Sequence, residues 1–206
     1  MIKLQPIHAA VLTLDNGQPI HVERIGRGMY SPAWKNGTAV YIQTHEDDAA
    51  KEMLCQIHDT PHLPTVERIH SDSDTSIYNW YKMPLYQKLT SAHKRAWTDY
   101  RALQKLRIKA SQTANFAWAK NLQCDSVNNE FLELVKQSPL AAQYEAPIEA
   151  LTEWCASYSQ SWLIEELQAR NCAVDANGDL ILLDPIFDLQ IIRDQQDAAM
   201  KRHRGY

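Results

Sequence analysis

The chain has 206 residues, of which 45% are hydrophobic, and a formal net charge of −4. This size and composition are typical of a globular protein of one or two domains, and the acidic balance disfavours general nucleic-acid binding. No apolar run approaches the roughly 20 residues that span a bilayer, and the N-terminus lacks the pattern of a secretory signal, so the four scattered cysteines are expected to be reduced thiols in the cytoplasm.

The first third of the chain predicts a sheet with one helix. Its apolar residues alternate with polar ones or cluster with Tyr, Trp and Ile, as in strands, and an Asn-Gly pair between apolar runs predicts a hairpin. Thr44 or Asp47 is placed to cap a helix that runs to about Ile57. The strands are expected at residues 8–24, as a hairpin with its turn at Asn16-Gly17, and at residues 38–43 and 77–83.

From Ser91 onward the spacing of apolar residues becomes that of amphipathic helices. Asp125 or Ser126 is expected to begin a second helix. Pro147 is expected to begin a third, because proline is favoured in the first helical turn. The buried faces are expected to carry Trp97, Tyr100, Leu103 and Leu106, then Phe131, Leu132 and Val135, and then Ile148, Leu151, Trp154, Cys155 and Tyr158. This order of elements indicates an α+β fold.

The segment from Asn171 to Asp184 carries the strongest functional signal. Its Asn177-Gly178 pair between apolar runs predicts a second hairpin with a tight two-residue turn. Asn171 stands at the entrance and Asp184 at the exit, and a carboxamide and a carboxylate so placed suit Mg²⁺. The alternative is that Asn171 caps a turn and that Asp184 precedes Pro185 because Asp-Pro favours turns.

This segment resembles the catalytic and metal-binding loops of eukaryotic-type protein kinases, and Asp184-Pro185-Ile186 resembles the Asp-Pro-x triplet of small bacteriophage serine/threonine kinases. Residues 25–34 resemble a kinase Gly-rich loop, and the strands and helix that follow come in kinase order. The resemblance implies a two-lobed fold with ATP and Mg²⁺ as cofactors. Its parts would be an antiparallel-sheet N-lobe with one helix over residues 1–84, a reduced and mostly helical C-lobe over residues 85–190, and a polar, basic tail over residues 191–206.

The resemblance also implies roles for individual residues. Glycines in the first loop would let backbone amides approach phosphates, whereas an ordinary hairpin turn is the alternative. Asn171 and Asp184 would hold the metal ion. The implied nucleotide-binding residues are Gly26, Gly28, Ser31, Gln43, Glu52, Met83 and Leu85.

Two positions depart from the kinase pattern. The strand lysine that pairs with the phosphates is replaced by Gln43, which carries no charge. The catalytic aspartate expected five residues before Asn171 is replaced by Glu166, whose extra methylene displaces the carboxylate of a catalytic base. The neighbouring Glu165 is expected to be a surface acid.

Three functions remain open. The departures favour a pseudokinase or atypical kinase that binds ATP with Mg²⁺ and acts by binding and modulating a partner protein, for example in phage takeover of a host or in defence. The alternatives are an active serine/threonine or small-molecule phosphotransferase with Glu166 as base, and a non-catalytic α+β interaction module. Neither a membrane nor nucleic acid is an expected partner, and the basic residues between Lys94 and Lys109 are interpreted as a solvated helix face.

Overall fold

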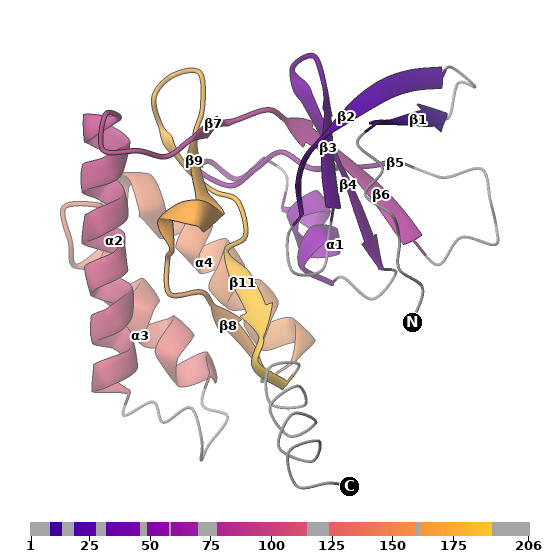
Figure 1. The fold of residues 1–206 in the computed structure, drawn as a ribbon. Helices are drawn as coiled ribbons and strands as arrows, with labels where there is room; N and C mark the ends of the chain where they lie inside the picture. The colour runs from indigo at the N-terminus through magenta and orange to yellow at the C-terminus, as the bar shows by residue number, and fades with distance from the viewer. Residues whose placement is uncertain are drawn as a thin grey trace, which may run out of the picture. The chain divides into compact units, whose positions relative to one another are not determined.

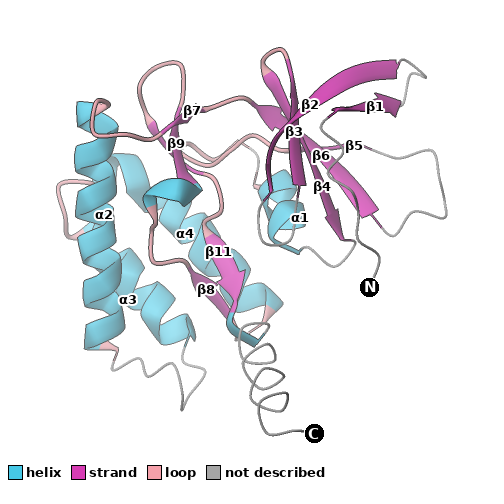
Figure 2. Ribbon diagram, in the orientation of Figure 1, coloured by secondary structure: helices cyan, strands magenta, loops and turns pink. Residues whose placement is uncertain are grey.

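The computed structural model describes residues 9–13, 19–27, 32–45, 49–57, 59–69, 78–114, 124–159 and 161–190. These residues form an α+β protein of helices and antiparallel sheets (Figure 2). The chain divides into two compact units, the first formed by Met1–Asp59 and Pro64–Tyr86, and the second by Thr60–Leu63 and Gln87–Tyr206. The predicted basic tail lies outside the described residues. Across the described ranges, no helix has the length and apolar character that crossing a membrane requires.

The first unit is a six-stranded antiparallel sheet with one helix (Figure 1). Its elements are β1 (Ala9–Thr13), β2 (Pro19–Arg27), β3 (Pro32–Asn36), β4 (Ala39–His45), α1 (Ala49–Gln56), β5 (Glu67–Ile69) and β6 (Tyr78–Pro84). The strand order is β1-β2-β3-β4-β6-β5. The β1–β2 pair, β4 and β6 confirm the strands predicted in this part of the chain, while the Asn16-Gly17 turn lies outside the described residues.

The register of the sheet assigns side chains to its two faces. Tyr81 in β6 pairs with Ile42, and its neighbour Trp80 pairs with Gln43. Side chains of directly paired residues share a face, and successive residues of a strand point to opposite faces. The Tyr81 hydroxyl donates a 2.5 Å hydrogen bond to Glu52 of α1. The helix therefore covers the face of Tyr81, and Gln43 lies on the opposite face.

Both faces of this sheet carry buried apolar side chains. On the Gln43 face, Trp34 packs against Trp80 with ring centroids 5.1 Å apart, within a cluster that includes Val22 and Tyr41.

Thr44, predicted to cap the helix, instead lies inside β4 and is buried, because the strand continues to His45. The other predicted cap, Asp47, lies outside the described residues.

The second unit contains three helices and two small sheets in its described residues (Figure 1). Its elements are β7 (Gln87–Lys88), α2 (Lys94–Thr113), α3 (Cys124–Lys136), α4 (Ala141–Tyr158), β8 (Trp162–Ile164), the 3₁₀ turn η1 (Ala169–Asn171), β9 (Cys172–Val174), β10 (Leu180–Leu182) and β11 (Ile186–Asp188). The strand orders are β10-β9-β7 and β11-β8, and all pairs are antiparallel.

The helices confirm the periodicity of the sequence, although α2 buries a different set of residues than predicted. Its buried face repeats every three or four residues, as predicted, but Trp97 and Leu106 are half-buried at the edges of this face. The buried residues of α2 are Ala96, Tyr100, Leu103, Arg107 and Ala110. An arginine therefore occupies a core position in which an apolar residue is expected.

Helix α4 begins six residues before the predicted start at Pro147, which lies inside the helix. Proline removes one backbone hydrogen bond from a helix. Tyr144 and Ile148 are both fully buried, so apolar packing on either side of the proline stabilises the continuous helix. At the other end Tyr158 is 60% exposed, and its predicted place on the buried face is wrong.

The second hairpin forms as predicted, but its turn is longer than the predicted two residues. The amide of Gly178 donates to the carbonyl of Asp175, and the amide of Asp175 donates to the carbonyl of Asp179. Gly178 has a φ of 85°, so the connection is a four-residue turn over residues 175–178 whose last residue is a left-handed glycine. The Asp175 carboxylate fixes this turn by accepting bonds from the amides of Asn177 and Asp179.

The segment Thr60–Leu63 belongs to the second unit and supports the hairpin. The carbonyl of His62 accepts a 2.9 Å bond from the amide of Leu182, and its Nδ1 lies 2.9 Å from the carbonyl of Leu180. The imidazole also packs on Tyr144, with ring centroids 4.4 Å apart. These contacts maintain a φ of 63° at His62, a left-handed value that non-glycine residues seldom adopt.

Candidate functional site

The candidate site lies at the base of the β9–β10 hairpin in the second unit. Asn171 ends the 3₁₀ turn that precedes β9, and Asp184 follows β10. The amide of Leu183 donates a 2.9 Å bond to the carbonyl of Asn171, so the two predicted metal ligands lie on neighbouring segments. Asp184 is exposed and Asn171 is partly buried. The hairpin thus brings together two polar residues that are 13 positions apart in the sequence.

Glu165 is the third member of this group, and its prediction as a surface acid is wrong. It directly follows β8, and its amide donates a 2.8 Å bond to the carbonyl of Pro185. The side-chain Nδ2 of Asn171 donates a 2.5 Å bond to its Oε2. Glu165 is partly buried. Glu165, Asn171 and Asp184 are called the hairpin-base cluster below.

The environment of Glu165 changes its acidity. Burial raises the pKa of its carboxyl group to about 7, and the negative charge of Asp184 acts in the same direction. The hydrogen bond from Asn171 and the positive charges of Arg170 and Arg107 oppose this rise. Burial is the dominant cause. A carboxyl group with this pKa exchanges its proton near neutral pH.

Glu166, the predicted catalytic base, has a different neighbour. On α2, the buried Arg107 donates from Nε to the carbonyl of Ile164, over 2.7 Å. Burial lowers the pKa of the Arg107 guanidinium to about 10, and among the charges that oppose this decrease Glu166 has the largest effect. Both adjacent glutamates thus act on Arg107, Glu166 more strongly, whereas the hydrogen bond with Asn171 is made by Glu165.

The hairpin-base cluster supplies the oxygen atoms that Mg²⁺ prefers. The Nδ2 atom of Asn171 is bonded to Glu165, so the Oδ1 atom is the one that can coordinate an ion. Within the described ranges no group of three or more His, Cys, Asp and Glu side chains is arranged to hold a metal ion. Mg²⁺ is commonly held by one or two carboxylates with phosphates and water. The donor set fits an ion that is shared with a phosphate ligand.

In the first unit, the predicted phosphate loop, residues 25–34, is described at its two ends, which lie in β2 and β3. Gly26 lies in β2, at a β-bulge where the register with β3 shifts between Arg24 and Gly26. A bulge bends a strand and increases its twist. Gly28 and Ser31 lie outside the described residues.

The structure does not bring together Gln43 and Glu52, the two positions that a kinase would pair. Gln43 lies on the sheet face opposite α1, as the register shows. Glu52 accepts the bond from Tyr81 and forms an ion pair with Arg68, whose Nη1 lies 3.0 Å from its Oε1. Arg68 is the cation that the sequence reasoning missed, and its position opposite Tyr81 in β5 is the feature that identifies it.

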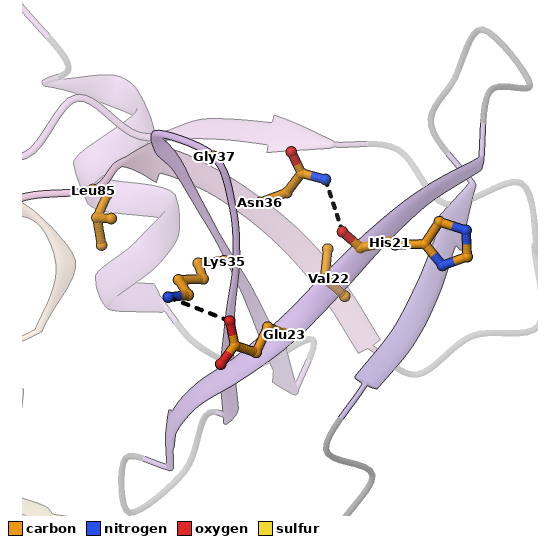
Figure 3. A pocket seen from close by; sticks show the side chains of 7 residues that line it. All are labelled: His21, Val22, Glu23, Lys35, Asn36, Gly37 and Leu85. Atoms are coloured by element: carbon orange, nitrogen blue, oxygen red, sulfur yellow. Dashed lines mark hydrogen bonds and ion pairs between the residues drawn. The ribbon is translucent and has the colours of Figure 1, made fainter.

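The predicted hinge residues lie at the end of β6. Met83 pairs with Val40, and the amide of Leu85 donates a 2.7 Å bond to the carbonyl of Thr38. Leu85 also lines a surface hollow, where Lys35 and Glu23 point toward each other from neighbouring strands (Figure 3). These two side chains are 40% and 69% exposed, so their ion pair adds little energy. The hollow is lined by His21, Val22, Glu23, Lys35, Asn36, Gly37 and Leu85.

Comparison of the chain with known proteins provides no family assignment. No protein-family model matches it, and no match is found among curated proteins.

Proposed function

We propose that the chain is a kinase-like protein that binds ATP with Mg²⁺ at the hairpin-base cluster and acts by binding and modulating a partner protein. The observation that carries this proposal is the convergence of Glu165, Asn171 and Asp184 at one end of a hairpin. Asn171 and Asp184 offer two oxygen ligands on one hairpin, and Glu165 holds the Asn171 side chain by a hydrogen bond. Such a set suits Mg²⁺ that is also bound to phosphates.

The order of the strands in the first unit supports the proposal. Without β1, the sheet runs β2-β3-β4-β6-β5, and α1 connects β4 to β5. Along the chain, β2, β3 and β4 are followed by α1 and then by β5 and β6, and this is the order of elements that the kinase resemblance implies. In the second unit, helix α4 is followed by β8, the 3₁₀ turn and the hairpin, again in the implied order.

Binding is favoured over catalysis because the groups that transfer a phosphoryl group in kinases are altered here. The lysine–glutamate ion pair has no counterpart, since Gln43 is uncharged and Glu52 is bonded to Tyr81 and Arg68. At the position of the catalytic base, Glu166 replaces the aspartate, and its negative charge raises the pKa of the buried Arg107. These substitutions are those expected of a pseudokinase.

Each member of the cluster would have a distinct task. Asn171 through Oδ1 and Asp184 through its carboxylate would hold the ion, and Glu165 would orient the Asn171 side chain through their hydrogen bond. An Mg²⁺ ion held by these residues would supply positive charge that offsets the negative charge of the phosphates. Asn171→Asp, which retains an oxygen ligand but loses the Nδ2 donor, separates orientation by Glu165 from coordination.

The experiment is calorimetry of ATP binding with Mg²⁺ and with EDTA. We expect binding to require Mg²⁺ and to weaken by about tenfold or more in Asp184→Ala and Asn171→Ala. Glu153→Ala is the matched control, because it removes an exposed carboxylate from α4 in the same unit. Absence of binding at millimolar ATP, or equal binding in all variants, would exclude the proposal and leave an α+β interaction module.

One observation favours a second candidate, an active phosphotransferase. Glu165 lies in the cluster with a pKa raised to about 7, the range in which a carboxylate works as a general base near neutral pH. In that case Glu165→Gln abolishes phosphoryl transfer while Mg²⁺-dependent ATP binding persists. A serine/threonine peptide library and a panel of small hydroxyl compounds are the substrates to assay. Transfer that persists in Glu165→Gln excludes Glu165 as the base.

A further inference from the structure

The segment Trp162–Leu167, which carries both adjacent glutamates, is held from two helices by polar side chains. On α3, the buried Asn128 donates from Nδ2 to the carbonyl of Trp162 over 3.1 Å. Its Oδ1 accepts a 3.0 Å bond from the amide of Ile164. Asn128 therefore provides β8 with the hydrogen bonds that a neighbouring strand would provide.

Helix α2 holds the same segment at two further points. Arg107 donates from Nε to the carbonyl of Ile164 over 2.7 Å, and Gln104 donates from Nε2 to the carbonyl of Leu167 over 2.8 Å. Residues three apart on a helix share a face, which is why both reach the segment. The two carbonyls flank Glu165 and Glu166, so the glutamates lie between fixed points.

Burying the charge of Arg107 in the core costs free energy. It is fully buried, and Nη1 donates a 2.6 Å bond to Ser111. Among the described residues Nη2 has no hydrogen-bond partner. A buried charge is often replaced by an apolar residue of similar volume without loss of stability. Core packing alone therefore does not account for the arginine, whereas its bond to the Ile164 carbonyl does.

We propose that Arg107 is a positioning residue, which with Gln104 and Asn128 fixes the Trp162–Leu167 segment so that Glu165 meets Asn171. The expected effect of this positioning is tighter binding of the phosphate ligand, and that part of the inference rests on the proposed function. A site held in its binding geometry before the ligand arrives loses less conformational freedom on binding. Loosening the segment should therefore weaken binding although no ligand contact is removed.

The test compares Arg107→Met with Lys105→Met, which alters an exposed cation on the same helix. Amide hydrogen exchange is measured at Ile164 and Glu165, with Leu151 in α4 as the reference. In Arg107→Met we expect exchange at Ile164 and Glu165 to rise about tenfold while Leu151 is unchanged. We also expect the Kd for ATP with Mg²⁺ to rise about tenfold, and Lys105→Met to change neither quantity.

A folded Arg107→Met protein with unchanged exchange at Ile164 and Glu165 would overturn the inference, as would equal acceleration at Leu151. If Arg107→Met does not fold, Gln104→Met removes the bond to Leu167, together with the bonds of the Gln104 side chain to Tyr100 and Arg101 on the same helix, and the same exchange result decides. Arg107→Lys should restore part of the protection, because it returns the charge but not the Nε bond. A wild-type protein that does not bind ATP refutes the proposed function, while the exchange experiment still decides on positioning.

Discussion

The raised pKa of Glu165 predicts how the stability of the fold depends on pH. The folded chain holds the proton of this carboxyl group to about pH 7, whereas the ordinary pKa is 4.5. Below pH 4.5 both states are protonated, and the stability that the folded environment gives to the neutral acid is fully present. It is lost as the pH rises through 7. The difference corresponds to about 3 kcal/mol at pH 8, of which about 2 kcal/mol develops between pH 5 and pH 8.

Glu165→Gln isolates this effect because glutamine has the same length and cannot ionise. Its Oε1 can still accept the bond from Nδ2 of Asn171. Between pH 5 and pH 8 we expect the free energy of unfolding of the variant to rise by about 2 kcal/mol relative to the wild type. Urea denaturation followed by tryptophan fluorescence, without Mg²⁺, measures this difference. Glu153→Gln controls for the loss of one exposed carboxylate.

An offset between wild type and Glu165→Gln that is the same at pH 5 and at pH 8 would refute the reasoning. It would mean that the carboxylate is as well solvated in the folded chain as in the unfolded one. A variant that loses stability relative to the wild type between pH 5 and pH 8 would show that the ionised group is stabilised by Asn171 more than burial disfavours it.

Three further predictions follow from the same structure. Asp184→Asn removes a negative charge that raises the pKa of Glu165, so the pH-dependent offset measured above should become smaller. Gly178→Ala should lower the free energy of unfolding by about 1 kcal/mol, because alanine is strained at a φ of 85°. The strain is in the backbone, since no heavy atom beyond the adjacent residues lies within 4 Å of the added Cβ, and equal stability in urea would contradict this prediction. Burial raises the pKa of Cys172 to about 12, so in a thiol-labelling time course the half-buried Cys55 should react before Cys172, and early labelling of Cys172 would argue against its burial.

Much of the fold could be predicted because it is encoded locally. The hairpins and the helices follow from turn residues and from the spacing of apolar side chains. Pro147 misled the prediction because a local rule places proline at a helix start, whereas the packing of Tyr144 and Ile148 maintains the helix on both sides. The buried Arg107 could not be predicted, because apolar periodicity alone provides no reason to place a charge in the core.

The face of the sheet on which a residue lies is harder to predict than the strand itself. The sequence correctly predicts that Gln43 lies in a strand, but because side chains alternate between the two faces, a shift by one residue moves Gln43 to the other face. The contacts of Glu52 with Tyr81 and Arg68 decide which face carries the helix. A motif that depends on two strands and a helix therefore needs the register, which sequence spacing alone does not determine.

The candidate site also differs from its prediction by one residue, because Glu165 takes the place expected for Glu166. Spacing from Asn171 indicates Glu166, yet the contact with Asn171 is made by Glu165. The bond between the amide of Glu165 and the carbonyl of Pro185 places Glu165 beside the exit of the hairpin, and Arg107 holds the carbonyl just before it. The chemistry of the cluster thus depends on which of two identical side chains the surrounding backbone bonds direct toward Asn171. Exchanging their partners would require moving the backbone that α2, α3 and the hairpin hold in common.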